Sequence, residues 1–419
     1  MDNAQNLNIL FIHYDLPAQF DHLIHYFSTQ TSHKIYAICQ SSAPLARHKN
    51  NRVTLYTYQP RPANSGTHRY VLDLERCAIK GQAIVNILQT CKRQGIHFDL
   101  AVAHTGWGET LYFKDIYPDT PLLGYVEFYY HAQGADAGFE PGDIISTDEA
   151  LRIRTLNAQL LLGMSSCDAL VTPTAWQKSL FPAIWQPHIN VIHEGVDIDK
   201  VKPDPAIRFT LPTGVTLTRD DEVVTYCARN LEPYRGFPTL LKAVELICQR
   251  RPHCHVIITG GDDVSYSKRL PEGQSYRQLL LKTVDLPHDR VHFLGSVPYS
   301  THLQILQLSS AHIYLTYPFV LSWSFMEAFA SGCVVIASDT PPVMDVLQPD
   351  INGLTVNFFD YQDIADRVDQ IFAHPQRMRH LGETARQTIV QYYQHRFSIR
   401  RYTRLFQQLL APAAESHYA

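Results

Sequence analysis

The 419-residue sequence has no long hydrophobic run, no large excess of either charge and no closely paired cysteines. No apolar segment approaches the roughly 20 residues that a membrane-spanning helix needs. The apolar run at residues 7–12 is too short for the core of a signal peptide. A formal net charge of −4 argues against binding nucleic acid through an overall positive field. We therefore expect a cytoplasmic protein without a nucleic-acid partner.

Eight cysteines lie in strand-like or helix-like contexts, and none forms a C-x-x-C pair. Isolated cysteines of this kind are typical of reduced thiols in the cytosol. His253, Cys254 and His255 form the single cluster that resembles a metal site, but no second pair of ligands is evident. We expect neither a metal nor a cofactor.

Composition and length favour two globular domains. Hydrophobic residues make up 45% of the chain and charged residues 18%, an ordinary balance for a globular protein. A chain of this length is too long for a single hydrophobic core. Apolar runs alternate with helical patterns through residues 1–199 and again through 222–395, which predicts two doubly wound parallel sheets with a cleft between them. The proline-containing segment 200–221 is the expected linker, and 396–419 is the expected terminal helix and tail.

The stretch from Tyr314 to Pro342 predicts a strand, a tight loop, a helix and a second strand. Ser324 stands three residues before Glu327, the spacing of a capping box at the start of a helix. Gly332 is expected to end that helix, and Thr340 to cap the next one. A helix that begins at the carboxyl end of a strand binds anions, because its free amides and its dipole point at the ligand.

Arg229 and Arg235 flank a loop that leaves the first strand of the second half. Two guanidinium groups at the carboxyl end of a strand suit a diphosphate, which each can bind through paired hydrogen bonds. The alternative is that they pair with Glu232 or lie in solvent. The expected helix start at residues 322–324 favours phosphate binding.

Three other features bear on function. The aromatic, glycine-rich stretch 128–146 is expected to be a long functional loop. Gly260-Gly261 does not belong to a G-x-G-x-x-G motif, so no nicotinamide site is expected. The terminal helices carry seven arginines opposed only by Glu383. A solvated or inter-domain face explains them, and contact with a membrane surface is the alternative; they are Arg377, Arg379, Arg386, Arg396, Arg400, Arg401 and Arg404.

These motifs resemble those of the retaining glycosyltransferases of family 4 (group 1), over nearly the whole chain and most strongly over residues 223–356. The resemblance implies the GT-B fold: an N-terminal acceptor-binding domain, a C-terminal domain that binds the nucleotide sugar, and terminal helices that cross back to the first domain. The segments that carry it are Gly195-Val196-Asp197, the pair Arg229 and Arg235 (with arginine in place of lysine), Gly260-Gly261, residues 293–297 and residues 321–327.

Three positions depart from the family pattern. The first glutamate of the E-x7-E motif falls on Phe319, so a usual contact to the donor sugar or its phosphate is absent. The N-terminal double glycine falls on Ala18-Gln19. The histidine that follows the fifth strand of the first domain aligns with Glu127, with His131 nearby. The diphosphate half of the site is therefore expected to be intact, and the sugar and acceptor half specialised.

The resemblance implies transfer of a sugar from a UDP- or GDP-linked donor to an acceptor hydroxyl, with retention and without a metal. Arg229 and Arg235 would stabilise the leaving diphosphate as catalytic groups, and Glu127 and His131 would face the sugar or the acceptor. Glu327 would hold the ribose. The full expected donor-binding set is Glu327, Ser322, Trp323, Ser324, Val297 and Gly260.

Other functions on this fold remain open at this point. An epimerase acting on sugar nucleotides would release no glycoside, and a phosphorylase would need phosphate as a co-substrate. A non-catalytic protein that binds sugar nucleotides is a further alternative, which Phe319 and the missing glycines motivate. The expected acceptor is a glycan, a lipid-linked or a small molecule, and peripheral membrane contact would run through the arginine-rich terminal helices.

Overall fold

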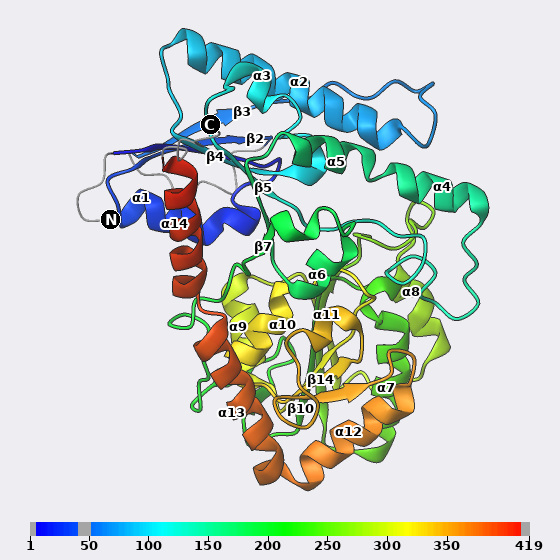
Figure 1. Cartoon of the computed structure of the whole chain (residues 1–419). Coiled ribbons are helices and arrows are strands. Elements are labelled where there is room, and N and C mark those ends of the chain that lie inside the picture. Colours follow the sequence, from blue (N-terminus) through cyan, green and yellow to red (C-terminus); the bar gives the residue numbers. More distant parts are fainter. Residues whose placement is uncertain (1–5, 41–51, 412–419) are drawn as a thin grey trace. The chain divides into compact units, whose positions relative to one another are not determined.

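The computed structural model describes residues 6–40 and 52–411, and these form two compact units (Figure 1). The first unit runs up to Glu194 and takes up the chain again from His395, and the second unit is Gly195–Gln394. The chain therefore returns to the first unit at its C-terminal end, as expected. Residues 412–419 of the expected tail lie outside the described residues.

The first unit is built on a seven-stranded parallel sheet with the strand order β3-β2-β1-β4-β5-β6-β7. Its strands are short apolar runs, as strands of a parallel sheet covered on both faces should be. The order reverses between β1 and β4, and ligands of such sheets bind beyond the carboxyl ends at this point. The strands are β1 (Asn8–Ile12), β2 (Lys34–Cys39), β3 (Val53–Thr57), β4 (Leu100–His104), β5 (Leu122–Tyr125), β6 (Ala169–Thr172) and β7 (Ile189–Val191).

The terminal helix α14 (His395–Leu410) packs on α1 (Asp21–Thr29) within the first unit (Figure 1). Tyr402 and Phe406 are buried, and the ring of Phe406 stacks on Phe27 with centroids 5.5 Å apart. The other helices are α2 (Leu72–Arg93), α3 (Phe113–Ile116), α4 (Thr147–Thr155), α5 (Ala158–Ser165) and α6 (Ala175–Leu180), with short 3-10 turns at Ala18–Phe20, Thr105–Trp107 and Gln186–His188.

The second unit contains a six-stranded parallel sheet with the order β12-β11-β10-β13-β14-β15. Its reversal lies between β10 and β13, so the loops after these two strands meet at the place where a ligand is expected. The strands are β10 (Val223–Asn230), β11 (His255–Gly261), β12 (Val291–Gly295), β13 (Ala311–Tyr314), β14 (Val335–Ser338) and β15 (Leu354–Val356).

Helices cover the second sheet, and α12 packs along α7 (Figure 1). The predicted cap at Thr340 is confirmed as the N-cap of α11, which carries proline in its first turn. The helices are α7 (Phe237–Arg250), α8 (Tyr276–Leu280), α9 (Tyr299–Leu308), α10 (Trp323–Ala330), α11 (Pro341–Met344), α12 (Tyr361–Ala373) and α13 (Pro375–Tyr392), with 3-10 turns at Pro233–Arg235 and Leu281–Thr283.

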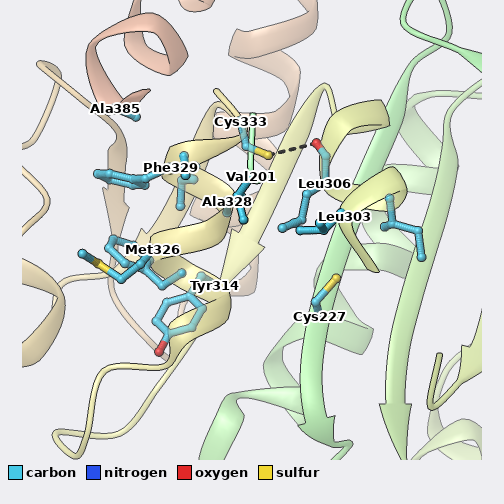
Figure 2. Close-up of a cluster of buried hydrophobic side chains, with 14 of the residues drawn as sticks. Val201, Cys227, Leu303, Leu306, Tyr314, Met326, Ala328, Phe329, Cys333 and Ala385 are labelled. Atoms are coloured by element: carbon cyan, nitrogen blue, oxygen red, sulfur yellow. Dashed lines mark hydrogen bonds between the residues drawn. The ribbon is translucent and has the colours of Figure 1, made fainter. Parts of the chain in front are cut away.

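The core of the second unit gathers around α10, whose Met326, Ala328 and Phe329 are buried (Figure 2). The thiol of Cys333 donates to the Leu306 carbonyl at 3.1 Å. All eight cysteines are free, and seven are buried. Burying apolar area stabilises a fold by about 25 cal/mol per Å², so this core fixes the helix whose N-terminus faces the expected ligand.

The segment 200–221 differs from the expected linker. It forms the antiparallel hairpin β8 (Arg208–Thr210) and β9 (Thr216–Thr218). Phe209, Leu211 and Leu217 are buried in the core of the second unit. The prolines of this segment favour a linker, but its alternating apolar residues place one face of each strand on the core. This face explains why the segment folds onto the second unit.

Two boundaries also differ from the sequence prediction. The helix expected over Glu149–Met164 is two helices, α4 and α5, separated at Leu156 and Asn157. The Asn157 side chain accepts from the Tyr130 amide and donates to the Tyr130 carbonyl, each at 2.9 Å, so it ties the break to the long loop. The strand expected at 333–336 is β14, shifted to 335–338.

Candidate active site

Arg229 and Arg235 lie at the carboxyl end of β10, where the sequence placed them. Arg229 is exposed near the last residue of the strand, and Arg235 is partly buried at the end of the 3-10 turn Pro233–Arg235. Gly236 follows with φ 73°, and a Cβ there would sit 2.4 Å from that of Leu315. Only glycine fits this turn, which carries the chain directly from Arg235 into α7.

Neutral groups hold the guanidinium of Arg235. Its Nη1 donates to Thr316 Oγ1 at 2.5 Å, to Tyr314 Oη at 3.4 Å and to the Val320 carbonyl at 3.5 Å. The guanidinium lies 5.3 Å from the ring centroid of Tyr266, a cation–π contact. None of these groups cancels its charge, so the positive charge remains available to an anion.

The alternative pairing of the arginines with Glu232 is wrong. The buried carboxylate of Glu232 accepts hydrogen bonds from the amides of Ser265, Tyr266 and Ser267, at 3.3, 3.1 and 2.8 Å. Those three amides satisfy the carboxylate, and it in turn fixes the loop that carries Tyr266. Across residues 6–40 and 52–411, neither Arg229 nor Arg235 forms an ion pair.

The N-terminus of α10 lies next to Arg235. Ser322 is its N-cap, and the Ser322 amide donates to the hydroxyl of Tyr314 at 2.9 Å, the same hydroxyl that Arg235 contacts. In the described part of the chain the amides of Trp323 and Ser324 have no hydrogen-bond acceptor. Two free amides and one guanidinium therefore gather beyond the end of β13.

The capping box between Ser324 and Glu327 is not formed. Ser322 occupies the cap without a side-chain bond to the helix, and its Oγ lies 2.9 Å from that of Ser324. The Glu327 carboxylate turns to α9, where it accepts from Tyr299 Oη at 2.7 Å and lies 3.0 Å from His302 Nε2. These tertiary partners outcompete the local cap because one of them carries a charge.

His302 is a positive partner for Glu327. Burial alone would lower the pKa of His302, but hydrogen bonds to the Cys227 side chain and to Glu327 raise it to about 10. The imidazolium and the carboxylate therefore form an ion pair at neutral pH. This pair orients Glu327, and sequence reasoning missed it because His302 is 25 residues away.

The remaining donor-side residues lie at neighbouring strand ends. Gly260 is next to last in β11 and has φ 154°, and a Cβ there would sit 2.8 Å from Leu231 Cδ2. Val297 follows β12 and packs against the core of the second unit. Both therefore lie on the edge where Arg229, Arg235 and the start of α10 are found.

Phe319, which replaces the first glutamate of the E-x7-E motif, is buried in an aromatic cluster. Its ring lies 5.4 Å from Tyr234 and 5.2 Å from Tyr266, and Tyr234 stacks on Tyr317 at 4.6 Å. The cluster brings Tyr266 over Arg235. An apolar wall therefore stands beside the guanidinium, at the position where the family carries a carboxylate.

In the first unit, the two predicted residues contact different partners. Glu127 follows β5 and accepts from Gln19 Nε2 at 2.8 Å, while its Oε2 lies 3.6 Å from His104 Nε2. His131 Nε2 lies 2.7 Å from the Leu180 carbonyl, which anchors the loop between β5 and α4. The sequence singled out neither His104 nor Gln19 as a polar partner, although His104 is a polar residue ending an apolar strand.

Buried ionisable groups follow the strands at this edge of the first sheet. Glu109 is buried and accepts from the Tyr14 amide at 3.1 Å, and burial raises its pKa to about 7. Burial, with the neighbouring His104, holds the pKa of His13 well below its ordinary value. Burial also lowers the pKa of His193 to about 4. The edge of the first sheet thus combines carboxyl groups with neutral imidazoles.

The remaining predictions concern metals, membranes and the arginine-rich tail. No group of three or more His, Cys, Asp or Glu residues is arranged for a metal within the described ranges. None of the helices described is both long and apolar enough to cross a membrane. Arg386 is not solvated: it donates at 2.6 Å to the carbonyls of Val201 and Ala330, which closes the C-terminal end of α10. The expectation that no metal or cofactor is used stays a prediction.

This architecture, with two doubly wound parallel sheets and a terminal helix that returns to the first unit, is the GT-B fold. Solved structures share it. The chain is similar to Anabaena HepE in complex with UDP-glucose (TM-score 0.67, 16% identity, covering 96% of this chain and 100% of that one). It is also similar to the sucrose-phosphate synthase of Thermosynechococcus elongatus (TM-score 0.70, 15% identity, covering 96% and 99%).

Sequence families agree with the fold. The model of the glycosyl transferase family 4 group matches residues 31–201, and that of the glycosyl transferases group 1 matches residues 214–388. The chain belongs to the glycosyltransferases of family 4, group 1. A curated relative, the GDP-mannose-dependent alpha-(1-6)-phosphatidylinositol monomannoside mannosyltransferase of Mycobacterium tuberculosis, is 24% identical over 239 residues. That match covers 53% of this chain and 57% of the relative's length.

Proposed function

We propose that this glycosyltransferase moves a sugar from a UDP- or GDP-linked donor to an acceptor hydroxyl, with retention at the anomeric carbon and without a metal. The observation that carries the proposal is the uncompensated charge of Arg235 beside the two free amides at the start of α10. Arg229 lies near the end of β10, the strand that leads into the turn carrying Arg235, and adds a second positive charge. Together they suit a diphosphate.

In this mechanism the catalytic work is electrostatic. Negative charge grows on the leaving diphosphate as the bond to the sugar breaks. Donors already held in place stabilise that charge without reorganising, and losing one typically costs about 3 kcal/mol of barrier. Arg235 is fixed by Thr316 and Tyr314, so it meets this requirement.

Glu327 is proposed to hold the ribose of the donor. The ion pair with His302 and the Tyr299 hydroxyl fix the carboxylate in one orientation, and each carboxylate oxygen can still accept a further hydrogen bond from a ribose hydroxyl. Gly260 and Val297 are assigned to the same nucleotide, because both lie on the edge of the sheet that carries the arginines.

In the first unit, Glu127 is proposed to face the sugar or the acceptor. His131 is already bound to the Leu180 carbonyl, so we assign it to the loop that surrounds this edge. The acceptor is proposed to be a glycan, a lipid-linked or a small molecule. The mycobacterial relative is named for a phosphatidylinositol acceptor, which supports the lipid-linked class. Membrane contact through the exposed arginines of α14 would suit such an acceptor, and binding to vesicles of anionic lipid would test it.

A second candidate function is nucleotide-sugar binding without catalysis. Phe319 favours it, because an aromatic cluster stands where the family has a carboxylate that contacts the donor. Such a protein would bind the nucleotide and yield no product with any acceptor. An epimerase or a phosphorylase on the same fold would be recognised by its products.

Calorimetric titration with UDP, GDP and ADP tests the proposal. We expect binding of UDP or GDP, which Arg229→Ala weakens strongly. Arg208→Ala, which removes an exposed arginine from the hairpin of the same unit, serves as the matched control and should bind as wild type. Absence of binding to all three nucleotides would overturn the donor site. Once a nucleotide is found, the anomeric configuration of the product and the rate in the presence of EDTA test retention and metal independence.

A further inference from the structure

The loop that leaves β11 carries an aromatic ring to the guanidinium of Arg235. Tyr266 lies in this loop, between β11 and α8, and the centroid of its ring is 5.3 Å from Arg235 Cζ. The side chain of Tyr266 is 42% exposed, although its ring also contacts Tyr234 and Phe319. A ring that is this exposed gains less from burial than a core ring does, so burial alone does not explain its position.

A buried carboxylate holds the loop in place. Glu232 is 1% exposed, and its Oε1 accepts from the Ser265 amide at 3.3 Å. Its Oε2 accepts from the amides of Tyr266 and Ser267 at 3.1 and 2.8 Å. Asn230, at the end of β10, adds a bond from its Nδ2 to Ser265 Oγ at 2.8 Å. Because a buried carboxylate is costly unless it is hydrogen-bonded, Glu232 and the loop stabilise each other.

The ring and the hydrogen bonds hold different parts of the guanidinium. All three hydrogen bonds that Arg235 donates within residues 6–40 and 52–411 use Nη1. Its Nη2 and Nε therefore keep N–H groups for a ligand. A planar guanidinium stacks on an aromatic face, so the Tyr266 ring restrains its orientation without using these groups. The ring also keeps water from that side, which strengthens the attraction of the cation to an anion.

We propose that Tyr266 is a positioning residue for Arg235, and that Glu232 in turn positions Tyr266. The ring holds the guanidinium so that its remaining N–H groups meet the diphosphate of the donor. This inference rests on the proposed function and adds to it two residues that act through Arg235. The role belongs to the aromatic ring and not to the tyrosine hydroxyl.

Two substitutions of Tyr266 separate the aromatic face from apolar bulk. Tyr266→Leu keeps an apolar side chain and removes the ring, and Tyr266→Phe keeps the ring and removes the hydroxyl. Calorimetry with UDP and GDP should show about tenfold weaker binding for Tyr266→Leu, the effect of one cation–π contact that is shielded from water. Tyr266→Phe should lose much less. Tyr392→Leu, at an exposed tyrosine of the same unit, is the matched control and should bind as wild type.

A double-mutant cycle tests whether the ring acts through Arg235. Arg235→Gln removes the cation, and the binding that remains through Arg229 and the amides of α10 is measured at higher nucleotide concentrations. In this background Tyr266→Leu should change the affinity by less than about twofold, because the ring no longer has a cation to hold. A ring that contacts the nucleotide directly, or only supports the loop, would cause the same tenfold loss in both backgrounds.

Glu232→Gln tests the step before the ring. Glutamine has a single acceptor oxygen, so its N–H₂ group would face at least one of the three amide donors of the loop. We expect a loss of nucleotide affinity close to that of Tyr266→Leu, and no additional loss when the two are combined. Thermal unfolding shows whether removal of the buried carboxylate unfolds the protein. The Tyr266 variants change an exposed side chain and test the proposal independently.

Three results would overturn the proposal while leaving the proposed function intact. In the first, Tyr266→Leu binds the nucleotide as wild type does. In the second, Tyr266→Phe loses as much affinity as Tyr266→Leu, which would assign the effect to the hydroxyl. In the third, the tenfold loss persists in the Arg235→Gln background. Failure of the proposed function is recognised differently, since the wild type then binds neither UDP nor GDP, and the role of Tyr266 falls with it.

Discussion

Histidines near the strand ends differ in charge between the two units at neutral pH: one is protonated in the second unit, and two are neutral in the first. In the second unit, hydrogen bonds to Cys227 and Glu327 outweigh burial and raise the pKa of His302 to about 10. In the first unit, burial lowers the pKa of His193 to about 4 and that of His13 well below its ordinary value. The same side chain is therefore a cation on one edge and a neutral hydrogen-bonding group on the other.

The difference follows the ligand that each edge is proposed to hold. A diphosphate needs positive charge that no carboxylate cancels, and Arg235 is held by neutral hydroxyl and carbonyl groups. A sugar needs donors and acceptors without net charge, and neutral imidazoles beside carboxyl groups supply them. The two sheets share one strand order over six strands, and the first adds a seventh. They thus differ in chemistry mainly through the residues at the ends of their strands.

The largest expected effect lies on the cationic edge. Arg229→Ala should lower the rate of sugar transfer by about a hundredfold or more, because one contact to the leaving diphosphate is lost. The side chain is exposed, so the unfolding temperature should stay that of wild type. Steady-state kinetics and thermal unfolding check both parts. A variant with unchanged rates would refute the role assigned to this arginine.

Removing the imidazole of His302 should change how stability depends on pH. A histidine whose pKa is raised on folding stabilises the protein fully below its unfolded pKa of about 6.5, and this contribution is lost as pH rises toward 10. His302→Gln should therefore be least stable relative to wild type at pH 6.5, by an amount on the order of 4 kcal/mol, and should approach wild type near pH 10.

Urea unfolding over that pH range measures the effect. Tyr299→Phe is the matched control, since it removes the other hydrogen bond to Glu327 and leaves the imidazole in place. Its stability should run parallel to that of wild type at all pH values. If His302→Gln also ran parallel, the histidine would not be the charged partner of Glu327.

Glu109 gives the opposite test on the first edge. Burial raises its pKa from 4.5 to about 7, so the folded protein binds the proton more tightly than the unfolded chain does. Stability from this group is present below about pH 4.5 and is lost as pH rises through 7. Glutamine does not ionise, so the stability of Glu109→Gln should not fall in this way as pH rises. The free energy of unfolding of the variant, relative to wild type, should therefore rise by as much as about 3 kcal/mol between pH 4.5 and pH 8.

Urea unfolding at pH 4.5 and pH 8 checks this prediction, with Glu272→Gln, at an exposed glutamate, as the control. The control should follow wild type at both pH values. A stability difference that stayed constant with pH for Glu109→Gln would show that the carboxyl group ionises as it does in solvent.

Local sequence patterns predicted the parts of the site that are local. The alternation of strands and helices, the cap at Thr340 and the position of Arg229 at a strand end all follow from neighbouring residues. Glu327 could not be predicted in this way. The spacing to Ser324 favoured a cap, whereas the structure pairs it with His302 on another helix.

The contact between His104 and Glu127 could not be predicted from local patterns for the same reason. His104 ends β4 and Glu127 follows β5, and only the pairing of these two strands in the sheet brings Glu127 Oε2 to 3.6 Å from His104 Nε2. The hairpin in the expected linker is a different case. Phe209 and Leu217 belong to alternating apolar patterns that are visible in the sequence, but the prolines nearby favoured a linker over strands.

The smallest expected effect concerns α14, which contrasts a buried face with a charged one on a single helix. Arg400, Arg401 and Arg404 are exposed, while Tyr402 and Phe406 are buried against the first unit. Because an exposed substitution usually changes stability by less than about 0.5 kcal/mol, replacing any one of these arginines with glutamine should leave urea unfolding nearly unchanged.

Phe406→Ala is the contrasting variant: it removes the ring that stacks on Phe27 and should cost about 3–5 kcal/mol. A large loss of unfolding free energy from an arginine substitution would mean that these side chains support the fold. The interpretation of the arginines as a solvated face would then be wrong. A small loss leaves them available to a partner or a lipid surface, since the apolar face alone then accounts for the return of the chain to the first unit.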